Sequence, residues 1–243
     1  MSKYDFDAVI ERRGTISAKW DGMEPLFGTN DLFPMWIADM DFKAPPEILE
    51  TLQERIDHGV LGYTRRFEPY REAVASWMER RHGWRPDTEW IRHTPGVVPA
   101  LAVSMLAFTQ PGDGILVQPP VYYPFFAAIT GRGRRVVENP LAFDGERFWM
   151  DFEDLERKLD DSSVKMAFLC SPHNPGGRVW TREELEKFAS LCAARGIIVI
   201  SDEIHCDVLF HGAKHTPLAD VSEEIAQLTI STVAPSKTFN VAG

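Results

Sequence analysis

The sequence contains few cysteines and no long apolar run. Its 3 cysteines, Cys170, Cys192 and Cys206, form no CxxC pair, a pattern typical of reduced, buried thiols and not of a disulfide framework. The longest apolar stretch, residues 97–108, is interrupted by Pro99 and Ser104 and is shorter than the about 20 apolar residues that cross a bilayer. We therefore expect no membrane span.

Basic side chains are also scarce relative to acidic ones. The chain has 26 Lys plus Arg against 36 Asp plus Glu, a formal net charge of -10. Nucleic acids and anionic membranes are bound by clustered Lys and Arg, so the composition argues against both partners. Residues 1–14 are charged and lack the apolar run of a signal peptide, which predicts a cytoplasmic protein.

Glycine and proline divide the chain into two regions. Residues 1–44 are irregular and predict an N-terminal arm, whereas residues 45–243 predict one large domain of regular elements. Helices are predicted at 46–58, 70–82, 97–108, 121–131, 152–159 and 181–195, and strands at 115–118, 135–138, 166–170, 197–201 and 228–231. This alternation predicts an α/β fold with a doubly wound, mostly parallel sheet. Ligands of such sheets bind beyond the carboxyl ends of the strands.

Three polar side chains follow three of these strands. Asn174 lies in the turn SPHNPGG, Asp202 follows the apolar strand 197–201, and Lys237 lies on a predicted loop over residues 232–240. Together they offer an amide, a carboxylate and an amine to one crevice. These groups match the phenolic oxygen, the protonated ring nitrogen and the aldehyde of pyridoxal 5′-phosphate.

A phosphate site is predicted where the helix over residues 97–108 begins. Gly96, Val97 and Val98 form a small-residue turn at the positive end of the helix dipole. The hydroxyl of Ser236, next to Lys237, adds a second predicted donor to the phosphate.

Two other kinds of site have weaker support. A zinc site is suggested by five side chains, His205, Cys206, Asp207, His211 and His215. Their spacing matches no common zinc pattern, and we predict no metal. The glycines of residues 131–133 follow a helix and lack the third glycine of a dinucleotide fingerprint, which argues against a nicotinamide enzyme.

The motifs SPHNPGG, SDEIHCD and SKTFNVAG, in this order, resemble those of fold-type I pyridoxal-phosphate enzymes of the aminotransferase class I and II group. The resemblance implies that Lys237 bonds the cofactor aldehyde and that Asp202 pairs with the pyridinium. It also implies that Asn174 donates to the phenolic oxygen and that Tyr123, in PPVYYPF, stacks on the ring.

Further motifs are similar to the cystathionine β-lyase, or carbon-sulfur lyase, branch of that group. They are MWIADMDF at residues 35–42, the segment 62–84, and SDEIHCDVLF, in which His205 stands where aminotransferases usually carry tyrosine. In this branch the tyrosine corresponding to Tyr63 reaches the phosphate of the neighbouring subunit, which implies a homodimer with shared sites.

The predicted function is therefore α,β-elimination of cystathionine or related cysteine S-conjugates, with pyridoxal 5′-phosphate as cofactor. An aminotransferase is the alternative with the same cofactor. Family members continue into a small C-terminal domain carrying a carboxylate-binding arginine, whereas this sequence stops at Gly243. We therefore expect that domain to be missing, and a non-catalytic cofactor-binding or regulatory protein remains a third alternative.

Overall fold

The computed structural model describes residues 4–65, 68–210 and 212–243, and their contacts group them into two compact units. The first unit combines the described residues up to 65 with residues 235–243, and the second contains those between 66 and 234. The predicted arm, residues 1–44, thus belongs to the first unit as far as it is described. The predicted domain limit at residue 44 stays a prediction.

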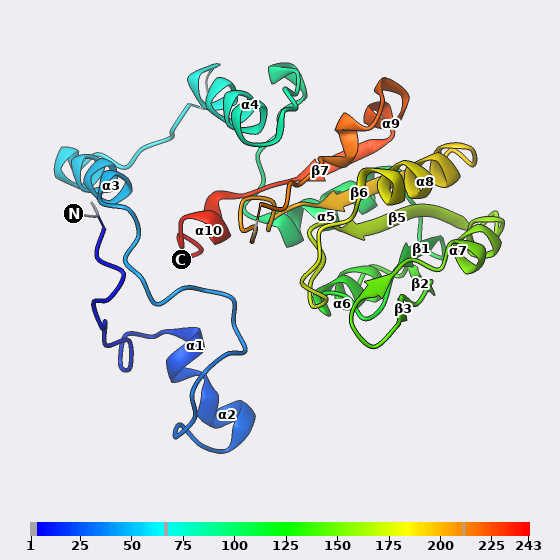
Figure 1. The fold of residues 1–243 in the computed structure, drawn as a ribbon. Helices are drawn as coiled ribbons and strands as arrows, with labels where there is room; N and C mark the ends of the chain where they lie inside the picture. Colours follow the sequence, from blue (N-terminus) through cyan, green and yellow to red (C-terminus); the bar gives the residue numbers. More distant parts are fainter. Residues whose placement is uncertain (1–3, 66–67, 211) are drawn as a thin grey trace. The chain divides into compact units, whose positions relative to one another are not determined.

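The first unit is helical with long connecting segments (Figure 1). Its helices are α1 (Ala18–Asp21), α2 (Met23–Phe27), α3 (Pro46–His58) and α10 (Pro235–Thr238). Helix α3 has the predicted bounds, with proline in its first turn and the left-handed Gly59 after its end. The predicted loop around Lys237 is wrong, because Lys237 lies in the single helical turn α10. One turn is too short to produce a periodic pattern, although Pro235 is well suited to begin it.

The second unit is built on a five-stranded parallel sheet in the order β2-β1-β5-β6-β7. Its strands are β1 (Gly114–Val117), β2 (Arg135–Glu138), β5 (Val164–Cys170), β6 (Ile198–Asp202) and β7 (Thr229–Thr232). A separate antiparallel pair is formed by β3 (Ala142–Phe143) and β4 (Phe148–Trp149). The helices are α4 (Glu68–His82), η1 (Thr88–Trp90), α5 (Val97–Phe108), α6 (Pro124–Thr130), α7 (Phe152–Leu159), α8 (Arg182–Ala193), η2 (Leu218–Asp220) and α9 (Glu223–Gln227).

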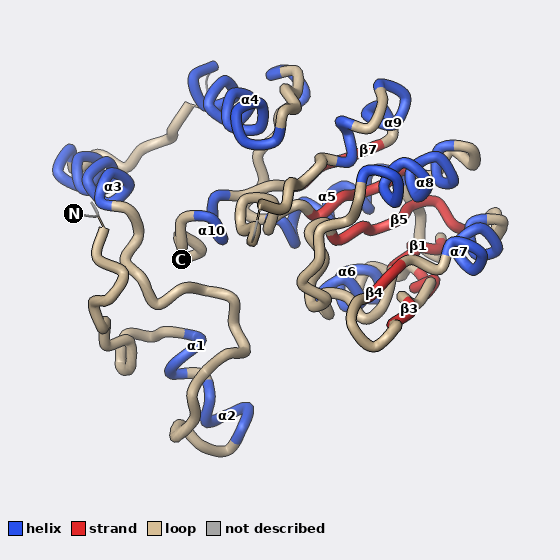
Figure 2. Tube along the Cα trace, in the orientation of Figure 1, coloured by secondary structure: helices blue, strands red, loops and turns tan. Residues whose placement is uncertain are grey.

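Helices cover both faces of this sheet, as predicted for a doubly wound fold (Figure 2). Along β5, Met166, Phe168 and Cys170 pack in one cluster with α5 and α6. Their neighbours Ala167 and Leu169 pack in a second cluster with α7, α8 and α9. This alternation is the two-residue period of a strand buried on both faces.

The elements predicted from sequence are present, with shifts at some ends. Helix α8 begins after Thr181, whose side chain forms the predicted capping box with Glu184. The strands β3 and β4 were not predicted, because two residues are too few to show alternation. None of the described helices is both long and apolar enough to cross a membrane. The cytoplasmic location stays a prediction.

Candidate active site

Asp202 is a buried carboxylate at the carboxyl edge of the sheet. It is the last residue of β6, is 3% exposed, and lies in register between Cys170 of β5 and Thr232 of β7. Two residues earlier, Ile200 packs in the cluster with α5 and α6, so strand alternation directs Asp202 to the same face. The backbone N–H of Ile204 donates to its Oδ1 over 3.2 Å. A buried carboxylate at this position is suited to bind a cationic group.

Two tyrosines follow β1, and Tyr122 packs against the same cluster as Ile200. Tyr122 is half-buried, and its pKa is raised by burial and by the negative charge of Asp202. Tyr123 is 79% exposed, and its ring centroid lies 5.9 Å from that of Tyr122. The stacking role of Tyr123 stays a prediction. Tyr122 is a second candidate for that role, and the adjacent pair YY in the sequence is the signal that points to it.

Asn174 lies in a turn that several contacts hold in place. Its backbone N–H donates to Sγ of Cys170 over 3.3 Å, and Nε1 of Trp180 donates to the carbonyl oxygen of Cys170 over 2.9 Å. The N–H of Gly176 donates to Nδ1 of His173 over 3.2 Å. A Cβ atom at Gly176 would stand 2.6 Å from that nitrogen, so only glycine fits this close approach. The turn therefore fixes the backbone from which the Asn174 amide projects.

The start of α5 has the geometry of an anion site. Because α5 leads into the amino end of β1, its own N-terminus lies toward the carboxyl edge of the sheet, and Val97 packs in the same cluster as Ile200 of β6. Gly96 caps the helix with φ 128° and ψ 168°, and its carbonyl oxygen accepts from Oγ1 of Thr94 over 2.9 Å. Val97 is buried, whereas Val98 is exposed. The first backbone N–H groups of a helix have no partner within the helix and favour a phosphate.

Three further predicted residues, Lys237, Ser236 and Tyr63, lie in the first unit, whereas His205 lies in the second. Nζ of Lys237 donates to the carbonyl oxygen of Ala38 over 3.0 Å. Ser236 precedes it in α10, and the side chain of Tyr63 is fully exposed. The structure therefore brings Asn174, Asp202 and the start of α5 together in one unit, and it places Lys237, Ser236 and Tyr63 in the other.

Comparison with known proteins assigns the chain to a family. The model of the family "Aminotransferase class I and II" matches residues 31–243. The chain belongs to this family. Cystathionine β-lyase PatB of Bacillus subtilis is 51% identical over 239 residues, which cover 98% of this chain and 62% of PatB. Protein MalY of Escherichia coli is 37% identical over 240 residues, covering 98% of this chain and 60% of MalY.

Solved structures of this family give the same result. Cystalysin of Treponema denticola, which contains pyridoxal 5′-phosphate, superposes with a TM-score of 0.94 at 43% identity. The match covers 99% of this chain and 61% of cystalysin. The pyridoxal-phosphate-bound C-S lyase of Staphylococcus hominis has a TM-score of 0.91 at 33% identity, over 100% of this chain and 61% of the lyase. This chain thus spans somewhat over half the length of these relatives.

The residues considered for zinc do not all meet at one place in the described structure. Asp207 accepts from Nε1 of Trp77 and contacts Nε2 of His82 at 2.9 Å. Cys206 is close to this pair, with possible ligand atoms of Cys206, Asp207 and His82 all within 4.8 Å of one another. The half-buried His205 is outside that group, and His211 lies outside the described residues. The absence of a metal stays a prediction.

Glu203 is a buried carboxylate for which no role was predicted from the sequence. It is wholly buried, and its Oε2 contacts Nε2 of His215 at 3.1 Å. Its Oε1 accepts from the N–H of Leu218 and from Oγ of Ser231. Glu203 thereby joins the end of β6 to β7 and to the segment before η2. The sequence feature that points to Glu203 is its position directly after Asp202, at the end of the predicted apolar strand.

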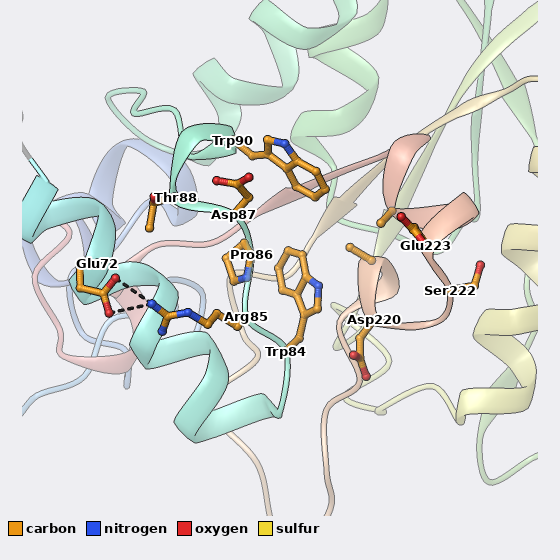
Figure 3. Close-up of a pocket in the computed structure, with 12 residues that line it drawn as sticks. Glu72, Trp84, Arg85, Pro86, Asp87, Thr88, Trp90, Asp220, Ser222 and Glu223 are labelled. Carbon is orange, nitrogen blue, oxygen red and sulfur yellow. Dashed lines mark hydrogen bonds and ion pairs between the residues drawn. The ribbon is translucent and has the colours of Figure 1, made fainter.

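A separate cavity of about 740 Å³ lies between α4, the segment after it, and α9 (Figure 3). Trp84 and Trp90 line it, and the guanidinium of Arg85 is held by Glu72 at 2.8 Å. None of the predicted cofactor residues is among the described residues that line this cavity. Its size is therefore no guide to the candidate site, which is defined by the strand ends and the start of α5.

Proposed function

We propose that this protein is a pyridoxal-phosphate-dependent carbon-sulfur β-lyase. It would convert cystathionine or related cysteine S-conjugates and water to a thiol, pyruvate and ammonia. The buried carboxylate of Asp202, on the same sheet face as the start of α5, is the observation that carries the proposal. The relatives described as cystathionine β-lyase or C-S lyase support it. Because the chain spans only part of those relatives, the activity of the whole protein is part of the proposal.

The residues present fit the cofactor. The buried Asp202 carboxylate suits a protonated ring nitrogen, which a neutral partner would hold less well. The glycine cap of α5, at φ 128°, lets a phosphate approach the backbone closely. When bound, the cofactor supplies an electron-accepting ring conjugated to the substrate amine.

Each proposed side chain would act on a stated atom of the cofactor or substrate. The Lys237 amine would bond the cofactor aldehyde and, when free, would remove the substrate Cα proton as a general base. Asp202 would hold the ring nitrogen in its protonated form, and the amide of Asn174 would donate to the phenolic oxygen. Tyr123 would pack on the ring. Removal of the Cα proton by Lys237 would let the C–S bond at Cβ break, with the thiolate leaving with the bonding electrons.

The phosphate would be held by backbone and side-chain donors of this chain and by a second subunit. Gly96, Val97 and Val98 donate backbone N–H groups, and Ser236 donates its hydroxyl. His205, at the position where aminotransferases usually carry a tyrosine, would also contact the cofactor. We infer a homodimer in which Tyr63 of each subunit reaches the phosphate of the other, and the full exposure of Tyr63 supports this role.

Elimination can be separated from transamination by its products. The chain, and the chain extended by the C-terminal region of the Bacillus subtilis relative, are loaded with pyridoxal 5′-phosphate and given cystathionine without a keto acid. We expect pyruvate and free thiol. Turnover that requires an added keto acid would instead indicate an aminotransferase, which the matches to N-succinyldiaminopimelate aminotransferase favour. Bound cofactor without turnover in either protein would indicate a non-catalytic cofactor-binding protein.

A further inference from the structure

Asn240 makes three hydrogen bonds to the N-terminal arm. Its Oδ1 accepts from the backbone N–H of Met40 over 3.0 Å. Its Nδ2 donates to the carbonyl oxygens of Met40 over 2.8 Å and of Phe42 over 2.9 Å. All three partners are backbone atoms about 200 positions away in the sequence. The Asn240 side chain therefore binds the backbone of the arm segment, and these hydrogen bonds do not involve the side chains of Met40 or Phe42.

The backbone of Asn240 is in the left-handed region. Its φ of 55° is one of two positive values among the described non-glycine residues, and asparagine tolerates this region better than most residues. The N–H of Val241 donates to the carbonyl oxygen of Ser236 over 3.1 Å, which closes the chain after α10. This reversal directs the Asn240 amide toward Met40.

Lys237 contacts the same arm segment. Its Nζ donates to the carbonyl oxygen of Ala38 over 3.0 Å, two residues before the Met40 amide that Asn240 binds. Lys237 and Asn240 are three residues apart, and so the α10 turn and the arm meet at two points. Ala38 and Met40 are only two residues apart, so a shift of the Met40 backbone would also shift the Ala38 carbonyl.

The far side of the segment is fixed by charged groups. Asp41 accepts from Arg12 and Lys19 at 2.6 Å each and from Nε1 of Trp20 at 2.8 Å. Arg12 also reaches Asp39 at 2.7 Å. The segment is thus held against the rest of the arm, and Asn240 and Lys237 both join it to the α10 turn and the residues that follow.

We propose that Asn240 is a positioning residue for Lys237. By fixing the backbone at Met40, it sets the place of the Ala38 carbonyl, and that carbonyl orients the Lys237 amine whenever the amine is free. The proposal rests on the proposed function insofar as Lys237 is the residue that bonds the cofactor. Lys237 without this acceptor would sample more rotamers and would meet the cofactor aldehyde in the correct orientation less often.

Two variants separate the side chain from the backbone. Asn240→Gly keeps access to positive φ and removes all three hydrogen bonds. Asn240→Asp keeps the shape and the acceptor for Met40 but turns an oxygen toward the carbonyls of Met40 and Phe42. Asn30→Gly is the matched control, because Asn30 is an arm asparagine whose side chain bonds Glu24.

The measurements are amide hydrogen exchange at Met40, the acetylation rate of Lys237 mapped by mass spectrometry, and the rate of cofactor capture at Lys237. We expect both Asn240 variants to raise Met40 exchange and Lys237 acetylation several-fold and to slow cofactor capture several-fold. Asn30→Gly should change none of these. Faster Met40 exchange with unchanged acetylation and capture would overturn the proposal, since Asn240 would then be purely structural.

The acetylation readout does not require the cofactor. If the unmodified protein captures pyridoxal 5′-phosphate elsewhere, the proposed function fails at Lys237. Acetylation that still responds to Asn240 would then support the coupling between Asn240 and Lys237, and acetylation that does not respond would overturn it.

Discussion

His173 is neutral in the folded protein because of its surroundings. Burial and the positive charge of Arg178 lower its pKa from 6.5 to about 4. Between these values the unfolded chain binds a proton that the folded chain does not, so stability falls as pH falls from about 6.5 to about 4. At about 1.4 kcal/mol per pKa unit, the loss from this residue is up to about 3 kcal/mol.

Urea unfolding measured at pH 7.5 and at pH 5 tests this prediction. His173→Gln should lower stability at pH 7.5 and should show a smaller loss on acidification than the unmodified protein. His58→Gln, at an exposed histidine, should keep the full pH dependence. The same pH dependence in all three proteins would show that His173 is not the titrating group.

The two tyrosines after β1 lead to opposite predictions. If Tyr123 stacks on the cofactor, Tyr123→Ala should raise the dissociation constant about tenfold, which corresponds to about 1.4 kcal/mol, and Tyr122→Ala should act mainly on stability. The charge of Asp202 acts on Tyr122, and so the reverse result would assign the stacking role to Tyr122. Fluorescence titration with pyridoxal 5′-phosphate distinguishes the two.

At this scale the sequence predicts where residues lie in the sheet better than it predicts their contacts. Asp202 and Asn174 were expected at the ends of parallel strands, and the structure has Asp202 at the end of β6 and Asn174 in the turn after β5. The contact of Lys237 with Ala38 was not predictable, because it joins positions 199 residues apart. The contacts of Glu203 are likewise made by segments that the fold alone brings together.

At the scale of elements, the start of α5 offers a controlled test of phosphate binding. Gly96 and Gly145 both have left-handed φ values, of 128° and 102°. A Cβ at either would meet no close atom, so alanine there costs mainly backbone strain, about 1–3 kcal/mol. Both Gly96→Ala and Gly145→Ala should therefore lower the melting temperature.

Cofactor binding should separate these two glycines. Gly96→Ala should weaken binding of pyridoxal 5′-phosphate about tenfold or more, because it displaces the backbone N–H groups that hold the phosphate. Gly145 lies in the turn between β3 and β4, so Gly145→Ala should bind the cofactor with unchanged affinity. Equal affinities of the two variants, measured by equilibrium titration, would contradict a phosphate site at α5.

How accurately the bounds of the helices were predicted depended on helix length and on the residues at the helix ends. Helices α3 and α5 were predicted with their observed bounds, because proline or glycine marks their ends. Helix α6 was predicted too long, since Val121 and its neighbours are apolar without being helical. Helix α10, which carries Lys237, spans four residues and has no sequence period.

At the scale of the whole molecule, apolar surface predicts self-association. Helix α5 packs on the sheet through Leu101 and Met105, yet Val103, Leu106 and Phe108 on its other sides are more than half exposed. A helix that is apolar all round is normally covered. Sedimentation at micromolar concentrations should show a dimer or larger species, weakened by Leu106→Glu but not by Val9→Glu in the arm. A monomer throughout that range would contradict the homodimer.

The proposed function requires that Lys237 bonds pyridoxal 5′-phosphate in a site whose ring partner is Asp202. This bond can be tested by incubating the protein with the cofactor, fixing the bond with borohydride and mapping the modified lysine by mass spectrometry. We expect one dominant label at Lys237, lost in Lys237→Ala. A dominant label at Lys165 or Lys214, or labelling unchanged in Lys237→Ala, would contradict it.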